Sequence, residues 1–195
     1  MRPYRRRKKQ TKGNYAFIDS QNLNLGTQKM GWKMDWRKFR QFLRDTYGVT
    51  HAYMFIGYMA ENEQLYEHMH ELGYLIVLKP TIDMKVLPEA ESEATENHDA
   101  AKVEKEKPTV KGNIDADLVL HAMKELPNYN KAIIVSGDGD FFGLIEYLVA
   151  QNKLLHIMTP NWQYSSLLKQ FEEYIVRLDV RKNELRYHDR HTRKK

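Results

Sequence analysis

Short apolar runs alternate with amphipathic segments along most of this chain, and this alternation restricts the possible folds more than any other feature. The apolar runs cover residues 15–19, 49–58, 74–80, 132–137 and 154–160. Strands that alternate with helices form β–α–β units, which build a parallel sheet. The run "AIIV" at 132–135 is apolar throughout, as expected for a strand that is covered on both faces. The sequence therefore predicts an α/β fold.

Helical periodicity predicts helices over residues 35–48, 61–73, 112–126, 140–152 and 165–171, with a short closing element at 173–178. For the first of these, we expect Asp35 to be the N-cap and Gly48 to end the helix. Residues 20–31, "SQNLNLGTQKMG", are polar with two glycines and are predicted to form a loop.

Positive charge is concentrated at the two ends of the chain. The net charge of the 195 residues is +5, but residues 1–12 alone carry seven Lys and Arg residues and no acid. Such blocks attract phosphate backbones, so the run Arg5, Arg6, Arg7, Lys8 and Lys9 is a candidate nucleic-acid contact. A purely solubilising tail and a nuclear-localisation signal are the alternatives. We expect residues 1–13 and 181–195 to be basic tails around a domain at 14–180, and residues 83–110 to be a flexible acidic insertion.

The composition excludes several classes of protein. The chain has no cysteine, which removes disulfide frameworks and Cys-ligated metal sites and fits a reducing cytoplasm. No apolar run reaches the length of a membrane span, and no apolar segment follows the basic N-terminus as in a secretory signal. We therefore expect a cytoplasmic protein with no membrane partner. The sequence leaves the oligomeric state open.

Acidic residues follow two of the predicted strands. Asp19 ends the first strand, and Asp138 and Asp140 follow the strand at 132–135. Ligands of such folds bind at the carboxyl ends of the strands, so these carboxylates would face one crevice if the two strands are neighbours. Crowded carboxylates favour a cation between them, and ligand sets made only of oxygen suit Mg²⁺ or Mn²⁺. The pattern predicts a divalent-cation site.

Each acid also has a simpler explanation. Asp140 and Asp115 could each be a helix N-cap. Asn22 could form only an Asx turn, and Asp117 could be a solvated acid in a first helical turn. These alternatives leave Asp19 and Asp138 unexplained, because a buried apolar strand gains nothing from a terminal carboxylate.

Three motifs carry a resemblance to a known family. The segments "FIDSQNL" at 17–23, "KGNIDADL" at 111–118 and "SGDGDFFGLIEYL" at 136–148 resemble the motifs of the NYN domain family, or LabA-like proteins, of the PIN-like nuclease superfamily. The resemblance extends over about residues 14–179. It implies a Rossmann-like three-layer α/β/α sandwich with a central, mainly parallel sheet, and metal-dependent cleavage of RNA.

The resemblance also implies roles for individual residues. The metal ligands for Mg²⁺ or Mn²⁺ would be Asp19, Asp115, Asp138 and Asp140. Asn22 would position the metal or substrate, and Lys111 could contact a phosphate. The middle motif departs from the family pattern by its "NID" and by the extra acid Asp117.

Two aromatic residues follow the last predicted strand. Trp162 and Tyr164 could stack on unpaired bases of single-stranded RNA, or they could form a surface lid on the core. The resulting hypothesis is a metal-dependent ribonuclease; the alternative is a weakly active or inactive module of the same fold that binds RNA or a protein. A phosphatase of the DxDx[TV] type and a P-loop enzyme do not fit, because neither motif is present.

Overall fold

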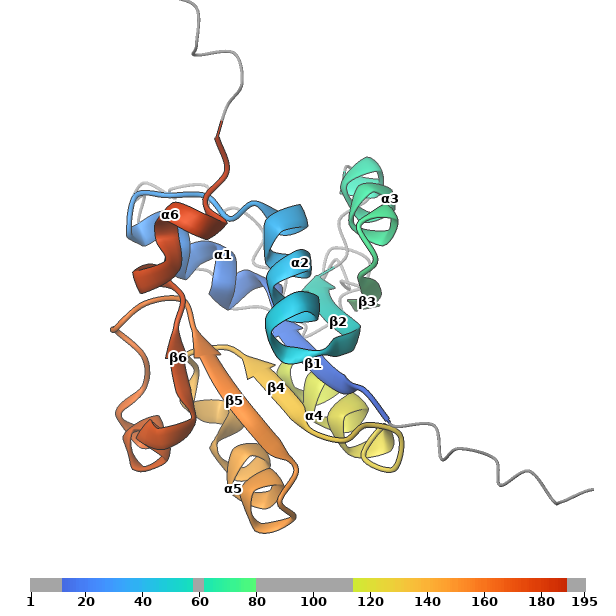
Figure 1. The fold of residues 1–195 in the computed structure, drawn as a ribbon, viewed down its shortest axis with the longest axis vertical. Coiled ribbons are helices and arrows are strands. Elements are labelled where there is room, and N and C mark those ends of the chain that lie inside the picture. Colours follow the sequence, from blue (N-terminus) through green and yellow to red (C-terminus); the bar gives the residue numbers. More distant parts are fainter. Residues whose placement is uncertain (1–11, 58–61, 80–113, 189–195) are drawn as a thin grey trace, which may run out of the picture.

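The computed structural model describes residues 12–57, 62–79 and 114–188, in which six strands form one sheet (Figure 1). The strands are β1 (Asn14–Asp19), β2 (Val49–Gly57), β3 (Leu75–Lys79), β4 (Ala132–Val135), β5 (Leu154–Thr159) and β6 (Ile175–Arg177). Their order is β3-β2-β1-β4-β5-β6, and all neighbours are parallel. This is the strand order of doubly wound dinucleotide-binding folds, so the predicted parallel sheet is confirmed.

Helices cover both faces of the sheet (Figure 1). The α-helices are α1 (Ser20–Lys29), α2 (Trp36–Tyr47), α3 (Glu63–Glu71), α4 (Ile114–Lys124), α5 (Phe142–Ala150) and α6 (Lys182–Leu185), and the 3₁₀ helices are η3 (Gly139–Phe141), η4 (Ser166–Tyr174) and η5 (Asp179–Arg181). One hydrophobic core joins the sheet to α1, α2, α3 and α6, and the other joins it to α4, α5 and η4. The three-layer α/β/α sandwich is therefore confirmed.

The ends of α2 follow local sequence signals. The Asp35 side chain accepts a hydrogen bond from the Lys38 backbone N–H at 3.2 Å. At the other end, Gly48 adopts a left-handed conformation with φ of +62°, which glycine reaches without steric cost. Both predicted caps are confirmed.

The loop predicted at residues 20–31 is wrong, because most of this segment forms α1. The side chain of Asp19 caps the helix by accepting from the Asn22 backbone N–H at 3.0 Å. Leu23 and Thr27 are its only buried residues, and they lie four apart on one face. This stripe is too narrow to give a helical period, so the helix depends on its cap and its packing.

The packed domain continues beyond residue 180, into the segment predicted as a C-terminal tail. Leu185 in α6 is fully buried in the core next to α2. The backbone N–H of Tyr187 donates to the Lys33 carbonyl at 2.8 Å, and Met34 forms an antiparallel bridge with Arg186. The segment was predicted to be a tail because it is rich in basic residues, but one apolar residue, Leu185, anchors it in the core.

Several predictions fall on other parts of the chain. Residues 1–11 of the predicted N-terminal tail, the acidic insertion at 83–110 and residues 189–195 lie outside the described residues. Among the helices that the structure describes, none has both the length and the apolar character needed to cross a membrane.

Candidate functional site

In folds with this strand order, ligands bind at the carboxyl ends of the two strands where the connections diverge, which here are β1 and β4. The chain passes from β1 outward to β3 and then returns to β4 on the other side of β1, so the connections diverge between these two strands. β1 and β4 pair in parallel register, from Tyr15 with Ala132 to Ile18 with Val135. The condition under which Asp19, Asp138 and Asp140 would face one crevice is therefore met.

Asp19 is a buried carboxylate at the end of β1, with 5% of its surface exposed. One carboxylate oxygen accepts from the Asn22 N–H at 3.0 Å, and the other accepts from the Ser136 hydroxyl at 3.1 Å. Burial raises the pKa of Asp19, and the charge of Asp138 adds to this effect. The two hydrogen bonds act in the opposite direction without cancelling the rise. Asp19 is thus held in place from two segments.

Ser136 and Asn22 connect the two strand ends. The Ser136 hydroxyl donates to Asp19 and accepts from the Asp138 backbone N–H at 3.1 Å. The side-chain oxygen of Asn22 accepts from the Gly137 N–H at 2.9 Å, so Asn22 does more than form a local Asx turn. Sequence reasoning missed Ser136, although a buried serine between an apolar strand and "GDGD" is a signal that could have identified it.

The two acids after β4 have different roles in the backbone. Asp138 is the N-cap of η3, and its side chain accepts from the Asp140 N–H at 3.1 Å. Asp140 lies in the first turn and is exposed. The alternative in which Asp140 is the helix cap is therefore wrong. The capping bond engages one carboxylate oxygen of Asp138, Oδ1.

Asp115 adds a fourth carboxylate from the first turn of α4. Partial burial raises its pKa, and so do the charges of Asp19, Asp138 and Asp140, whereas Lys79 lowers it. The charges of the other three acids thus reach Asp115, and we name these four acids the acidic edge. Asp115 is half-buried inside the helix and is not its N-cap.

Asp117 is paired with a cation. Lys79 at the end of β3 forms an ion pair with it at 3.1 Å. Asp117 lies in the first turn of α4, as predicted, and is partly exposed, but it also has this ion-pair partner. The pair also brings a positive charge from β3 to the rim of the acidic edge.

The predicted nucleic-acid contacts divide into two groups. Trp162 is 57% exposed, and Tyr164 is half-buried next to Gly137, where an added Cβ would lie 3.2 Å from the Tyr164 Cβ. A backbone hydrogen bond of 2.9 Å from Ser165 to Gly137 fixes this contact. Tyr164 thus borders the acidic edge. The other candidates lie outside the described residues: Arg5, Arg6, Arg7, Lys8, Lys9 and Lys111.

The acidic edge has suitable donors for a hard cation but no closed cage. In the described part of the chain, no group of three or more His, Asp or Glu side chains is arranged to hold a metal ion. Mg²⁺, however, often keeps several water ligands and binds through only one or two carboxylates. A donor set made only of oxygen atoms fits such an ion. The assignment of these residues as metal ligands stays a prediction.

Two known proteins are similar to this chain. It is 25% identical over 170 residues to "Low amplitude and bright protein LabA" of Synechococcus elongatus, which covers 85% of this chain and 83% of that protein. Its fold is similar to the crystal structure of a protein of unknown function from Vibrio parahaemolyticus. That similarity has a TM-score of 0.62 and 18% identity, and it covers 93% of this chain and 100% of the other. At this identity the second similarity concerns the fold alone.

A family match covers the same region as the sheet and the acidic edge. The sequence matches the NYN domain over residues 15–179, from β1 to the end of β6. The match includes the segments that supply Asp19, Asp115, Asp138 and Asp140. The chain therefore belongs to the NYN domain family, and this membership indicates a nuclease-like, RNA-related function.

Proposed function

We propose that this protein is a metal-dependent ribonuclease that hydrolyses RNA phosphodiester bonds at the acidic edge. The observation that carries the proposal is that acids from β1, α4 and the loop after β4 lie near one another: burial raises the pKa of Asp115, and the charges of Asp19, Asp138 and Asp140 add to this rise. A protein that only binds a polyanion would gain affinity without these charges. A hydrolase needs them to hold a cation beside the scissile phosphate.

Asp19, Asp115, Asp138 and Asp140 are the residues that would hold Mg²⁺ or Mn²⁺. When bound, such an ion supplies an activated water and stabilises the leaving oxygen. Asp140 is exposed, and Asp115 and Asp138 are half-buried, so their side chains have room to reorient. Asp19 is the fixed member, because Ser136 and the Asn22 N–H hold its two oxygens.

The residues around the acidic edge have complementary roles in this proposal. Asn22 holds the loop after β4 in place through Gly137. Tyr164 at the border, with the exposed Trp162, would stack on unpaired bases, which favours single-stranded RNA. The basic residues 5–9 and Lys111 would contribute affinity for the backbone that does not depend on sequence.

A single-turnover cleavage assay tests the proposal. The full chain is incubated with end-labelled single-stranded RNA and Mn²⁺, with and without EDTA, beside Asp138→Asn. We expect EDTA to abolish cleavage. Asp138→Asn should slow it by about 10²-fold or more, because even changes outside the ligand sphere of a metal site cost about 10–100-fold. RNA affinity should hold or increase, since a negative charge facing the phosphate is removed.

A matched variant separates the acidic edge from general charge. Asp45→Asn removes an exposed carboxylate on α2 that pairs only with its neighbour Arg44 among the described residues, and it should cleave at the wild-type rate. Folded wild-type protein that binds RNA but does not cleave it with either metal would support the alternative, a non-catalytic RNA-binding module. Wild-type cleavage by Asp138→Asn would exclude the proposed role of the acidic edge.

A further inference from the structure

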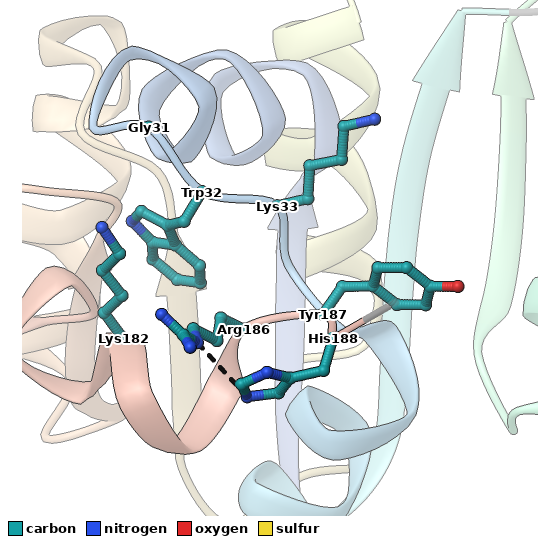
Figure 2. Close-up of a pocket in the computed structure, with 7 residues that line it drawn as sticks. All are labelled: Gly31, Trp32, Lys33, Lys182, Arg186, Tyr187 and His188. Carbon is teal, nitrogen blue, oxygen red and sulfur yellow. Dashed lines mark hydrogen bonds between the residues drawn. The ribbon is translucent and has the colours of Figure 1, made fainter. Parts of the chain in front are cut away.

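An open pocket of about 490 Å³ lies beyond the end of α1, apart from the acidic edge (Figure 2). Residues 31–33 form one wall, and Lys182 with residues 186–188 forms the other. These segments are about 150 residues apart in the sequence and are joined by the hydrogen bond from Tyr187 to Lys33. We name this cavity the Trp32 pocket after its buried aromatic residue.

The Trp32 pocket has a positive lining. Lys33, Lys182 and Arg186 contribute three cations, and among the residues that the structure describes no acidic side chain lines it. Two nearby acids that the structure describes are engaged elsewhere: Glu184 pairs with Arg181 at 3.3 Å, and Asp35 caps α2 and lies 3.8 Å from Lys38. Asp189 lies outside the described residues. The pocket therefore favours an anion.

Trp32 provides a second and independent sign of a missing ligand. Its side chain is 6% exposed, and its indole Nε1–H has no hydrogen-bond partner in the described part of the chain. Buried donors in native proteins are nearly always paired, so an unpaired one points to an acceptor that the protein atoms do not supply. An oxyanion is such an acceptor.

The basic side chains are placed around this indole. Figure 2 shows Lys182 and Arg186 beside the indole of Trp32, whereas Lys33 points away from them. Arg186 donates through Nε to His188 at 3.2 Å, which leaves its terminal nitrogens for a ligand. Within the described residues, the hydrogen bond of Lys182 is a long one, of 3.4 Å, to the Met30 carbonyl. A guanidinium fork, an ammonium and an indole N–H together match the oxygens of a phosphate group.

We propose that the Trp32 pocket binds a phosphate group, with the RNA backbone as its source. That source rests on the proposed function, whereas the phosphate chemistry does not. α1 starts at its Asp19 cap and ends at Lys29, so its ends are about 15 Å apart at 1.5 Å per residue. A smaller pocket of about 210 Å³ lies along α1 between these two ends and is lined by Asn22 and Lys29 among other residues. The bound phosphate therefore belongs to a nucleotide remote from the scissile bond.

Nitrogen-15 NMR of the full chain in EDTA tests this proposal without turnover. The protein has three tryptophans, so it gives three indole N–H signals, and Trp32→Phe identifies the one that belongs to Trp32. We expect inorganic phosphate to shift this signal in a saturable manner, because the indole gains an acceptor. Single-stranded RNA should shift the same signal, and phosphate should compete with it.

Two variants provide the specificity control. Arg186→Gln should weaken phosphate binding by about tenfold or more, since it removes charge-assisted hydrogen bonds while leaving the Arg186 backbone contacts. Lys124→Gln removes an exposed cation at the end of α4 and should leave the affinity unchanged. A Trp32 signal that does not respond to phosphate, or that responds equally in Arg186→Gln, overturns the proposal.

The remaining outcomes identify the source of the phosphate. If the Trp32 signal responds to inorganic phosphate and to RNA, and the two compete, then RNA is the source of the bound phosphate. A response to inorganic phosphate alone supports the phosphate site but overturns RNA as its source. Failure of the ribonuclease proposal is distinguishable, because the Trp32 signal would then respond to phosphate in a protein that cleaves no RNA with Mn²⁺.

Discussion

At the residue scale, Asp19 combines two functions in one carboxylate. It caps α1 through the Asn22 N–H and accepts from Ser136 across the crevice. Burial disfavours the charged forms of both Asp19 and Asp115 and so raises the pKa of each, and the charges of neighbouring acids add to this effect. The ionised forms of these carboxylates are therefore unfavourable in the folded protein, and a bound cation would stabilise them most at this site.

This cost predicts the pH dependence of stability in EDTA. The pKa values of Asp19 and Asp115 are raised above 3.8 in the folded protein, so the folded state holds these protons more tightly than the unfolded state. Their contribution to stability is full below about pH 3.8 and is lost as the pH rises through the raised values. As the pH rises through these values, the Asp19→Asn variant should lose less stability than the wild type does. Urea unfolding at pH values from about 4 to 8 measures it.

The same titration distinguishes this explanation from a general acid effect. Asp45→Asn removes an exposed carboxylate whose pKa is lowered by Arg44, so it should retain the wild-type decline with pH. Parallel stability profiles for the wild type and Asp19→Asn would contradict the role assigned to Asp19. Millimolar Mn²⁺ should reduce the decline in the wild type, because it relieves the same repulsion.

At the scale of elements, α1 depends on close contact with the loop after β5. The side-chain amide of Asn161 donates to the Gly26 carbonyl at 2.9 Å. A Cβ built on Gly26 would lie 2.5 Å from the Cβ of Pro160, so only glycine allows this approach. The contact holds α1 against the loop after β5. Asn22 lies one helical turn before Gly26.

Two glycine substitutions test this packing. Gly26→Ala should destabilise the protein by about 1–3 kcal/mol, because overpacking outweighs the gain in helix propensity. Gly143→Ala in α5 adds a methyl group that meets no atom within 4 Å, and it should stabilise by about 0.5–1 kcal/mol. Urea unfolding of both variants is the measurement. If Gly26→Ala and Gly143→Ala stabilise the protein equally, Pro160 moves away from the added methyl group at little cost.

At the scale of the whole molecule, the C-terminal segment closes one of the two cores. Leu185 is fully buried and belongs to the same core as Leu23 of α1 and Leu43 of α2. The segment also forms one wall of the Trp32 pocket. Its stability and the proposed phosphate site are therefore coupled.

Truncation of this anchor has a predictable cost. Leu185→Ala should destabilise the fold by about 2–5 kcal/mol, as for other buried leucines. Val180→Ala, at a side chain that is 71% exposed in the same segment, should stay within about 0.5 kcal/mol of the wild type. Chemical denaturation measures both. A small effect of Leu185→Ala would mean that α6 is not part of the cooperative core.

The sequence by itself determined the elements whose signals are local. The apolar runs specified five parallel strands, Asp35 and Gly48 specified the ends of α2, and the motifs specified which acids stand at strand ends. These features depend on residues only a few positions apart, so the pattern of neighbours is sufficient to predict them. The family followed from the same three motifs.

Only the tertiary structure decided how these parts meet. The pairing of β1 with β4, the hydrogen bond from Ser136 to Asp19 and that from Gly137 to Asn22 join residues 115–117 positions apart. The sequence did not predict α1 and α6, because each helix is anchored by only one or two buried side chains. Contacts of this kind leave no periodic trace in the sequence, because their free energy comes from surfaces that exist only after the sheet has formed.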